Sequence, residues 1–178
     1  MSFGRANQQW ATFSRVWHIL NADRQPAGGI GVLVSRYVQG LHKPIYHPTS
    51  DVGDHVVVVN AKKIAYSGNK WEEKVFTAHT GRRKGRVRMQ AFKVHELDPT
   101  WIIRRNIYRQ IPNNLLRRTL FQRVHVFEDE NVPAEIIENV TNVLIGPRPV
   151  PKAITDYTEE EKDSFPKLFL RDKYFLKS

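Results

Sequence analysis

A strand–helix–strand pattern in the first third of the chain constrains its fold more than any other feature. The apolar run over 16–20 predicts a short strand that ends in turn-prone residues. From Gly28 the apolar residues recur with helical spacing, which predicts a helix that stops at Gly40. Residues 55–60 are β-branched and apolar without alternation, as expected of a strand covered on both faces. This order predicts a right-handed βαβ unit, and hence an α/β fold with a small parallel sheet.

The middle of the chain carries signals for shorter elements. Asp98 and Pro99 suit the start of a helix, and Pro112 suits its end. We expect a strand over 74–78, a basic loop over 81–85, a helix over 99–111, a second short basic helix over 115–122 and a strand over 124–127.

The character of the chain changes after residue 130. Apolar spacing predicts a helix over 133–144, and the proline-rich run over 146–151 predicts a stiff linker. Thr158 and Glu161 form a capping box for a short acidic helix. We therefore expect a basic N-terminal extension over 1–14, an α/β domain over 15–130, and an acidic C-terminal extension with a proline-rich linker over 131–178.

Positive charge is concentrated in one block of the sequence. The 178 residues carry a formal net charge of +10, which favours a polyanionic partner. Residues 82–125 alone hold 12 Lys/Arg and 2 Asp/Glu, whereas residues 126–178 hold 7 Lys/Arg and 11 Asp/Glu. This segregation indicates one cationic surface and a separate acidic tail.

The most basic stretch has the composition of an RNA-binding loop. Guanidinium groups bind phosphate in a bidentate manner, and glycine lets the backbone approach a sugar-phosphate chain closely. Arginine-rich loops with glycine suit folded RNA, which is recognised by shape and backbone. The loop cations are Arg82, Arg83, Lys84, Arg86 and Arg88, next to Gly81 and His79. The cations that we expect to extend this surface are Arg104, Arg105, Arg109, Arg117, Arg118 and Arg123.

Other chemistries find little support in the sequence. The absence of cysteine excludes disulfides, thiolate metal sites and a cysteine nucleophile. Gly29 and Gly31 open a helix after a strand, but Val34 stands where a dinucleotide fingerprint needs glycine. Nucleotide binding therefore stays a minor alternative. No apolar run approaches the roughly 20 residues of a membrane span.

Histidines and acids also form no recognisable catalytic pattern. His42, His47 and His55 lack metal-ligand spacing, although the chain holds 7 histidines. Asp51 and Asp54 flank a glycine and suit turn or cap positions. We expect no metal, no cofactor, no small-molecule substrate, no catalytic residue and no membrane insertion.

The start of the chain is open to two interpretations. Arg5 and Arg15 precede the first carboxylate, Asp23, among many small polar residues. This composition fits an organelle-targeting segment or an ordinary basic N-terminus.

Six motifs in order carry a family resemblance. They are WHILNA over 17–22, LHKPIY over 41–46, GDHVVVVNAKKI over 53–64, SGNK over 67–70, HTG over 79–81 and IPNN over 111–114. Over about residues 10–130 the chain resembles the universal large-subunit ribosomal protein thirteen family. The resemblance implies an α/β fold with helices on both sides of the sheet, and a non-enzymatic role in binding large-subunit rRNA and supporting subunit assembly.

The resemblance also implies RNA-facing residues and a location. The matching positions are Lys43, Asn69, Lys70, His79, Thr80 and Gly81. The arginine-rich run after Gly81 is more basic than in the family. The C-terminal extension and the acid-free start resemble the mitochondrial branch, so we expect a mitochondrial ribosome in the matrix, with residues 131–178 contacting neighbouring large-subunit proteins. A free regulatory RNA-binding protein, acting outside the ribosome, is the alternative.

Overall fold

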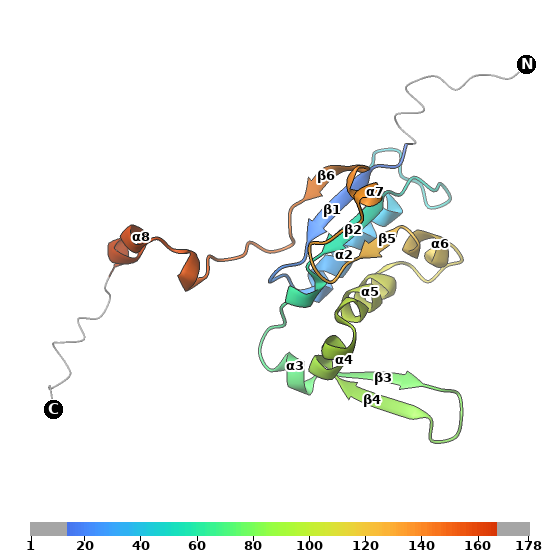
Figure 1. Cartoon of the computed structure of the whole chain (residues 1–178). Helices are drawn as coiled ribbons and strands as arrows, with labels where there is room; N and C mark the ends of the chain where they lie inside the picture. Colours follow the sequence, from blue (N-terminus) through green and yellow to red (C-terminus); the bar gives the residue numbers. More distant parts are fainter. Residues whose placement is uncertain (1–13, 167–178) are drawn as a thin grey trace, which may run out of the picture.

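A four-stranded parallel sheet forms the centre of the molecule in the computed structural model, which describes residues 14–166 (Figure 1). The strand order is β5-β2-β1-β6. The strands are β1 (Trp17–Asn21), β2 (His55–Val59), β5 (Val124–Val126) and β6 (Val140–Leu144). The expected N-terminal extension lies outside the described residues except for Ser14.

The βαβ unit predicted from the sequence is confirmed. Helix α2 (Ala27–Gln39) joins β1 to β2, which pair in parallel from Trp17 opposite His55 to Asn21 opposite Val59. Gly40 ends the helix with a φ of 79°, a left-handed conformation that glycine adopts without strain. Four of the five residues of β2 are buried, as its continuous apolar run predicted.

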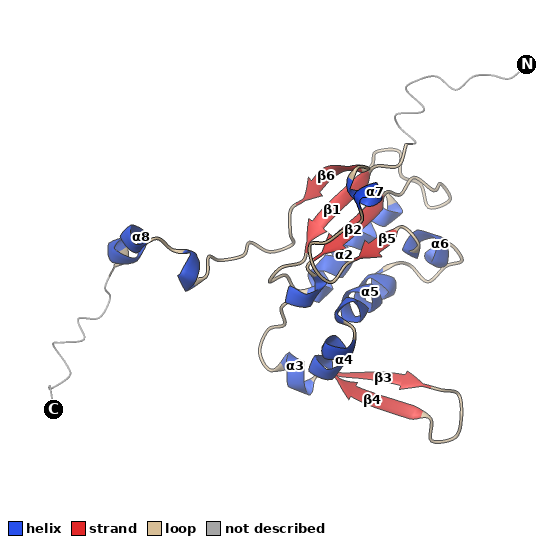
Figure 2. Ribbon diagram, viewed as in Figure 1, coloured by secondary structure: helices blue, strands red, loops and turns tan. Residues whose placement is uncertain are grey.

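Helices cover both faces of the sheet, as expected. On one face α2 packs against α5 (Pro99–Gln110), which begins where the Asp98 side chain accepts the Thr100 N–H at 2.9 Å. Between sheet and helices lies the core, which includes Leu20, Val56, Val58, Ile30, Val34, Ile103 and Ile107. On the other face lies the short helix α7 (Ala134–Ile137), in front of the sheet in Figure 2.

The helix predicted over 133–144 is wrong. Helix α7 ends at Ile137, and residues Val140–Leu144 form β6, which pairs in parallel with β1. The apolar spacing was compatible with either element, and the open edge of β1 supplies the backbone partners that favour the strand. The fold therefore continues past residue 130. The Gln25 side chain also attaches the backbone of Arg148 to the domain. Its amide donates to the Arg148 carbonyl at 2.6 Å and accepts the Arg148 N–H at 3.1 Å.

A two-stranded antiparallel hairpin projects from the helical side (Figure 1). It consists of β3 (Val75–His79) and β4 (Arg86–Gln90), with α3 (Lys70–Glu73) before it and α4 (Ala91–Leu97) after it. The sequence predicted β3 and the loop but not β4, whose alternating cations obscured the strand.

Short helices complete the described chain. They are η1 (Ala61–Lys63), α6 (Arg117–Phe121), η2 (Ile154–Asp156) and α8 (Glu159–Ser164). The capping box of Thr158 and Glu161 at the start of α8 is confirmed. Across residues 14–166, no helix combines the length and the apolar character needed to cross a membrane.

Candidate nucleic-acid interface

The hairpin presents one polar and one apolar face. Thr77 pairs with Arg88 and His79 with Arg86, whereas Phe76 pairs with Met89. Because side chains alternate along a strand, the two arginines lie on the face opposite Phe76. Phe76 is 8% exposed and packs edge-on against Trp101 of α5, with ring centroids 5.0 Å apart. This anchor fixes the direction in which the arginines point.

The tip of the hairpin is a structured turn. The Thr80 N–H donates to the Gly85 carbonyl at 3.0 Å, and the Gly85 N–H donates to the Arg82 carbonyl at 2.9 Å. Gly81 and Lys84 take positive φ values of 83° and 61°. The turn therefore fixes the backbone from which its basic side chains extend.

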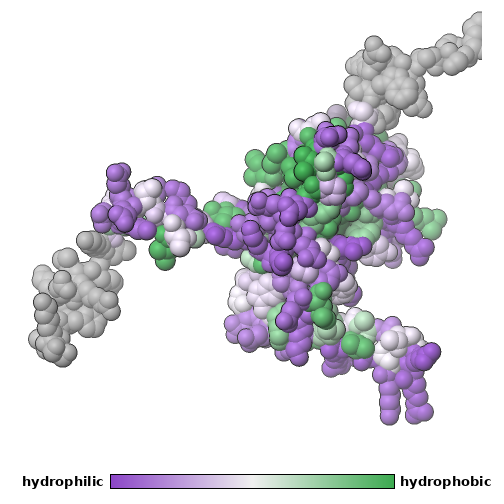
Figure 3. All heavy atoms as spheres, in the orientation of Figure 1, coloured by the Kyte–Doolittle hydropathy of each residue, from purple (hydrophilic) through white to green (hydrophobic). Residues whose placement is uncertain are grey.

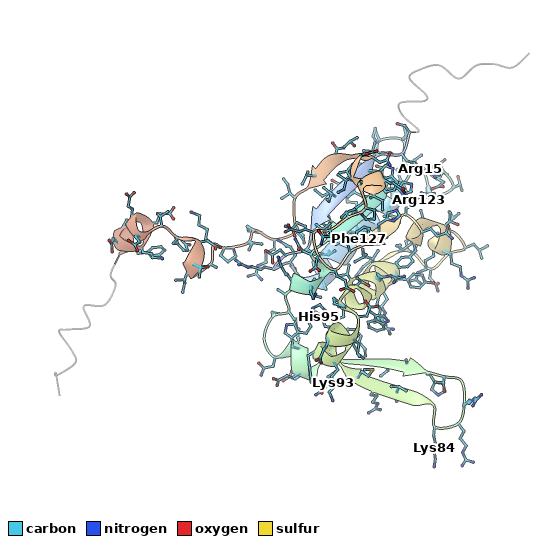
Figure 4. The ribbon with its side chains drawn as sticks, in the orientation of Figure 1. Arg15, Lys84, Lys93, His95, Arg123 and Phe127 are labelled. Atoms are coloured by element: carbon cyan, nitrogen blue, oxygen red, sulfur yellow. The ribbon has the colours of Figure 1, made fainter. Side chains whose placement is uncertain are left out.

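Arg82, Arg83 and Lys84 at this tip are exposed, and none of them forms an ion pair within residues 14–166. Figure 4 places Lys84 at the outer end of the hairpin, far from the sheet. Figure 3 shows a hydrophilic surface at the same place. The structure thus brings together the loop cations predicted from the sequence and leaves them open to a partner.

His79 lies next to this tip with one ring nitrogen committed. Its Nδ1 accepts the Gly81 N–H at 2.9 Å. The proton of the neutral ring is then on Nε2, which leaves an N–H donor at an exposed position. His79 can donate this hydrogen to a phosphate oxygen.

The arginines on α5 and α6 differ in how free they are. Arg104 and Arg118 are exposed, whereas Arg105 lies over the Trp101 ring at 5.0 Å. Arg117 donates from Nε to the Tyr108 carbonyl at 2.8 Å and lies 4.0 Å above the Tyr108 ring. Arg104 and Arg118 are therefore available to RNA, while Arg105 and Arg117 are half-buried and held by aromatic neighbours.

Asn69 and Lys70 are exposed at the start of α3, before the hairpin. The Lys70 ammonium donates to the Ser67 hydroxyl at 3.0 Å. The sequence missed Lys93, which Figure 4 places near the base of the hairpin. Its position after β4 becomes apparent only once that strand is known.

The model of one protein family, ribosomal protein L13, matches residues 15–133. The chain belongs to this family. The large ribosomal subunit protein uL13m of Drosophila melanogaster is 41% identical over 176 residues, which is 99% of each chain. The uL13 proteins of Acholeplasma laidlawii and Vesicomyosocius okutanii are 32% and 36% identical, over 66% and 65% of this chain and 82% and 81% of their own lengths. The C-terminal part of this L13-family chain thus has a counterpart in the fly protein.

Lys43 is enclosed rather than presented to a ligand. Its Nζ donates to Asp54 Oδ1 at 2.5 Å and to the Val52 carbonyl at 2.9 Å, and its side chain is 14% exposed. Burial by itself would raise the pKa of Asp54, but hydrogen bonds from His18, Lys43 and the Val16 amide outweigh it and hold this pKa at about 2. We therefore leave Lys43 out of the RNA surface that we propose for this family member.

His18, His42 and Asp54 form a cluster whose ligand atoms lie within 4.8 Å of one another, a geometry that could hold a metal ion. Asp54 Oδ2 lies 3.2 Å and 3.0 Å from the two Nε2 atoms, and Oδ1 receives Lys43 and the Val16 N–H. All acceptor positions of the carboxylate are thus used, and the ammonium of Lys43 already supplies the cation. The cluster connects three parts of the fold: His18 lies on β1, His42 lies before the loop over 44–53, and Asp54 lies directly after that loop. Sequence spacing could not indicate this cluster, because His18 lies on a strand that is distant along the chain.

Arg123 lies inside the fold, so its expected place on the basic surface is wrong. It is 4% exposed and donates from Nη1 to Asp51 Oδ1 at 2.6 Å, with a second contact from Nη2 to Oδ2. Arg15 contacts the same carboxylate at 3.0 Å, and Figure 4 shows the two arginines together. The hydrogen bond from Arg123 lowers the pKa of Asp51 against the opposing effect of burial. Asp51 is thus an ion-pair partner that links two ends of the domain.

Proposed function

We propose that this protein is a structural constituent of the mitochondrial large ribosomal subunit, and that it binds large-subunit rRNA through the β3–β4 hairpin and the neighbouring faces of α5 and α6. The observation that carries the proposal is the unpaired cationic tip, Arg82 to Lys84, on a member of a ribosomal protein family. The match to the fly protein over 99% of the chain supports the mitochondrial location.

Binding rests on phosphate contacts. Each contact releases counterions from the RNA, so affinity falls steeply as salt rises. The anchored hairpin and its closed turn lower the entropy that is lost on binding, because the backbone that carries the cations is already ordered. The proposed contacts are Asn69, Lys70, His79, Thr80, Gly81, Arg82, Arg83, Lys84, Arg86, Arg88, Arg104 and Arg118, with Arg105 and Arg117 supporting them through aromatic packing.

The role that we propose is non-catalytic. The most enclosed carboxylate, Asp54, is engaged by four donors within the protein and has no free lone pair for substrate chemistry. The protein contributes shape and charge to the assembled particle rather than a reaction.

The end of the chain serves a different partner. Residues 159–163 of α8 include Glu159, Glu160, Glu161 and Asp163, and this helix has no buried residue. Negative charge is repelled by RNA phosphates. We infer that the part of the extension beyond Arg148 contacts basic surfaces of neighbouring large-subunit proteins.

Sedimentation of a mitochondrial lysate tests the proposal. The protein should travel with large subunits, and replacement of Arg82, Arg83 and Lys84 by glutamate should move it to the top of the gradient. Replacement of Arg82 and Arg83 by lysine keeps the charge and should keep the association. Wild-type protein at the top of the gradient would instead favour a free RNA-binding protein.

A further inference from the structure

A cavity of about 660 Å³ lies at the carboxyl end of the parallel sheet. Arg24 and Gly28 reach it from the segment that follows β1, Lys70 and Lys74 from the segment that follows β2, and Arg148 from the segment that follows β6. Most of these residues are exposed, so the cavity opens to solvent.

The cavity lies where the strand order of the sheet reverses, which is a common position for ligand sites. From β1 the chain proceeds to β2 and then β5 on one side, whereas β6 is added on the other side of β1. In open α/β sheets, ligands bind outside the carboxyl ends of the strands at the point where the strand order reverses. Arg24 and Arg148 flank that point.

The charges around the cavity are positive and poorly neutralised. Four cationic residues and one acid, Glu73, line the cavity. Burial lowers the pKa of Lys74, and the nearby Lys70 and Arg109 lower it further. Among residues 14–166, Lys70, Lys74 and Arg148 form no ion pair, and Arg24 has only a 3.9 Å contact with Asp156. An anion would relieve this repulsion.

Backbone donors point to the same ligand. Helix α2 begins after Pro26 without a side-chain cap and without an acid in its first turn. The N–H groups of Gly28 and Gly29 have no acceptor among the described residues. The amide of Gln25 holds the Arg148 backbone in place beside them. The cations and the donors thus converge on one cavity from three separate segments.

We propose that this cavity binds a phosphate group of the RNA backbone, as a contact separate from the hairpin. The inference rests on the proposed function for the identity of the polyanion. An open cavity whose cations come from three segments suits a continuous strand, and Lys70 connects it with the RNA-facing start of α3.

The decisive variant is Gly28→Asp in the full-length protein. A Cβ at Gly28 meets no atom within 4 Å, and an acid in the first turn favours a helix, so the fold is preserved. Val32→Glu is the matched control, because Val32 is 57% exposed on the same helix and does not line the cavity. Binding to mitochondrial large-subunit rRNA is measured as a function of salt. Relative to the control, Gly28→Asp should weaken binding about tenfold and lower the salt exponent by about one.

A second measurement separates RNA from a free phosphate compound. Inorganic pyrophosphate is titrated while the backbone amide signals of residues 27–29 are followed by NMR. The proposal is supported if pyrophosphate shifts these signals in the wild-type protein but not in Gly28→Asp, and if Gly28→Asp also lowers the salt exponent of RNA binding. Shifts without any change in RNA binding would assign the cavity to a free phosphorylated molecule and overturn the RNA assignment.

The remaining outcomes keep the two hypotheses apart. If Gly28→Asp matches Val32→Glu in the salt exponent while the hairpin variant loses RNA, the cavity proposal is wrong and the proposed function stands. If the wild-type protein binds no rRNA, the proposed function and the RNA assignment of the cavity both fail, and the pyrophosphate titration alone shows whether the cavity binds phosphate.

Discussion

Positive charge occupies two different settings in this protein. Lys43 and Arg123 are enclosed and paired with Asp54 and Asp51, whereas the hairpin tip from Arg82 to Lys84 is exposed and unpaired. The same residue types therefore stabilise the fold in one region and await a partner in the other. The comparison teaches that the density of cations in a sequence overestimates the surface that can bind RNA.

The difference arises from what surrounds each charge. Gly53 lets the segment between the two aspartates approach α2, since a Cβ there would overlap the Val38 carbonyl. Asp51 and Asp54 are thereby placed against cations that would otherwise be desolvated alone. At the hairpin tip no acid of the described residues pairs with the cations, so water solvates these charges and they stay open to the RNA that we propose as their partner.

Removal of the buried acid should have the largest effect. Asp54→Asn leaves the Lys43 ammonium enclosed without its counter-charge, and should cost about 3–5 kcal/mol in the free energy of unfolding. Urea unfolding followed by circular dichroism measures it. The salt exponent for rRNA binding by the folded fraction should stay unchanged, and a reduced exponent would mean that this cluster also contacts RNA.

Neutralising the hairpin tip should weaken RNA binding without changing the stability of the fold. The triple change Arg82→Gln, Arg83→Gln and Lys84→Gln should lower rRNA affinity by roughly a hundredfold or more and the salt exponent by about three. The midpoint of urea unfolding should not move. A loss of stability comparable to that of Asp54→Asn would show that the two regions are not separate in role.

Acid titration sharpens the same contrast. Folding lowers the pKa of Asp54 to about 2, so the carboxylate contributes stability above its unfolded pKa, and this stability is lost as pH falls through the folded value. This carboxylate should account for a drop of roughly 2–3 kcal/mol in the free energy of unfolding between about pH 5 and pH 1. Asp54→Asn, measured over the same range, should lack this part of the decrease. An equal decrease in both proteins would contradict the assignment.

Two adjacent arginines offer the finest test. Arg117 is held by Tyr108, so Arg117→Ala should cost about 1 kcal/mol of stability. Arg118 is exposed, so Arg118→Ala should leave stability unchanged and lower the salt exponent by about one. Thermal unfolding and rRNA titration of both variants measure these effects. A reversal of the two results would place Arg117 on the RNA surface.

Much of the fold was predictable where local signals agree with tertiary needs. The periodicity of α2, the stop at Gly40, the Asp98 cap and the buried run of β2 each have a local physical cause. The strand β6 was missed because its apolar residues also fit a helix, and only the free edge of β1 decides between the two.

The candidate site divides in the same way. The exposed cations of the loop were predicted because glycines and arginines adjoin in the sequence. Arg24 and Arg148 were missed, since they are 124 residues apart and come together only through the addition of β6 beside β1. Lys43 and Arg123 were assigned to the surface because their acidic partners are not evident from composition.

The sequence by itself determined the strand–helix–strand core, the segregation of charge and the membership of the L13 family, because hydrophobic spacing, charge order and motif order are properties of the linear chain. Only the tertiary structure decided which cations are enclosed and which are free. That outcome depends on which distant segments pack together, and pairing with a buried carboxylate removes a charge from the surface however basic its neighbours in sequence are.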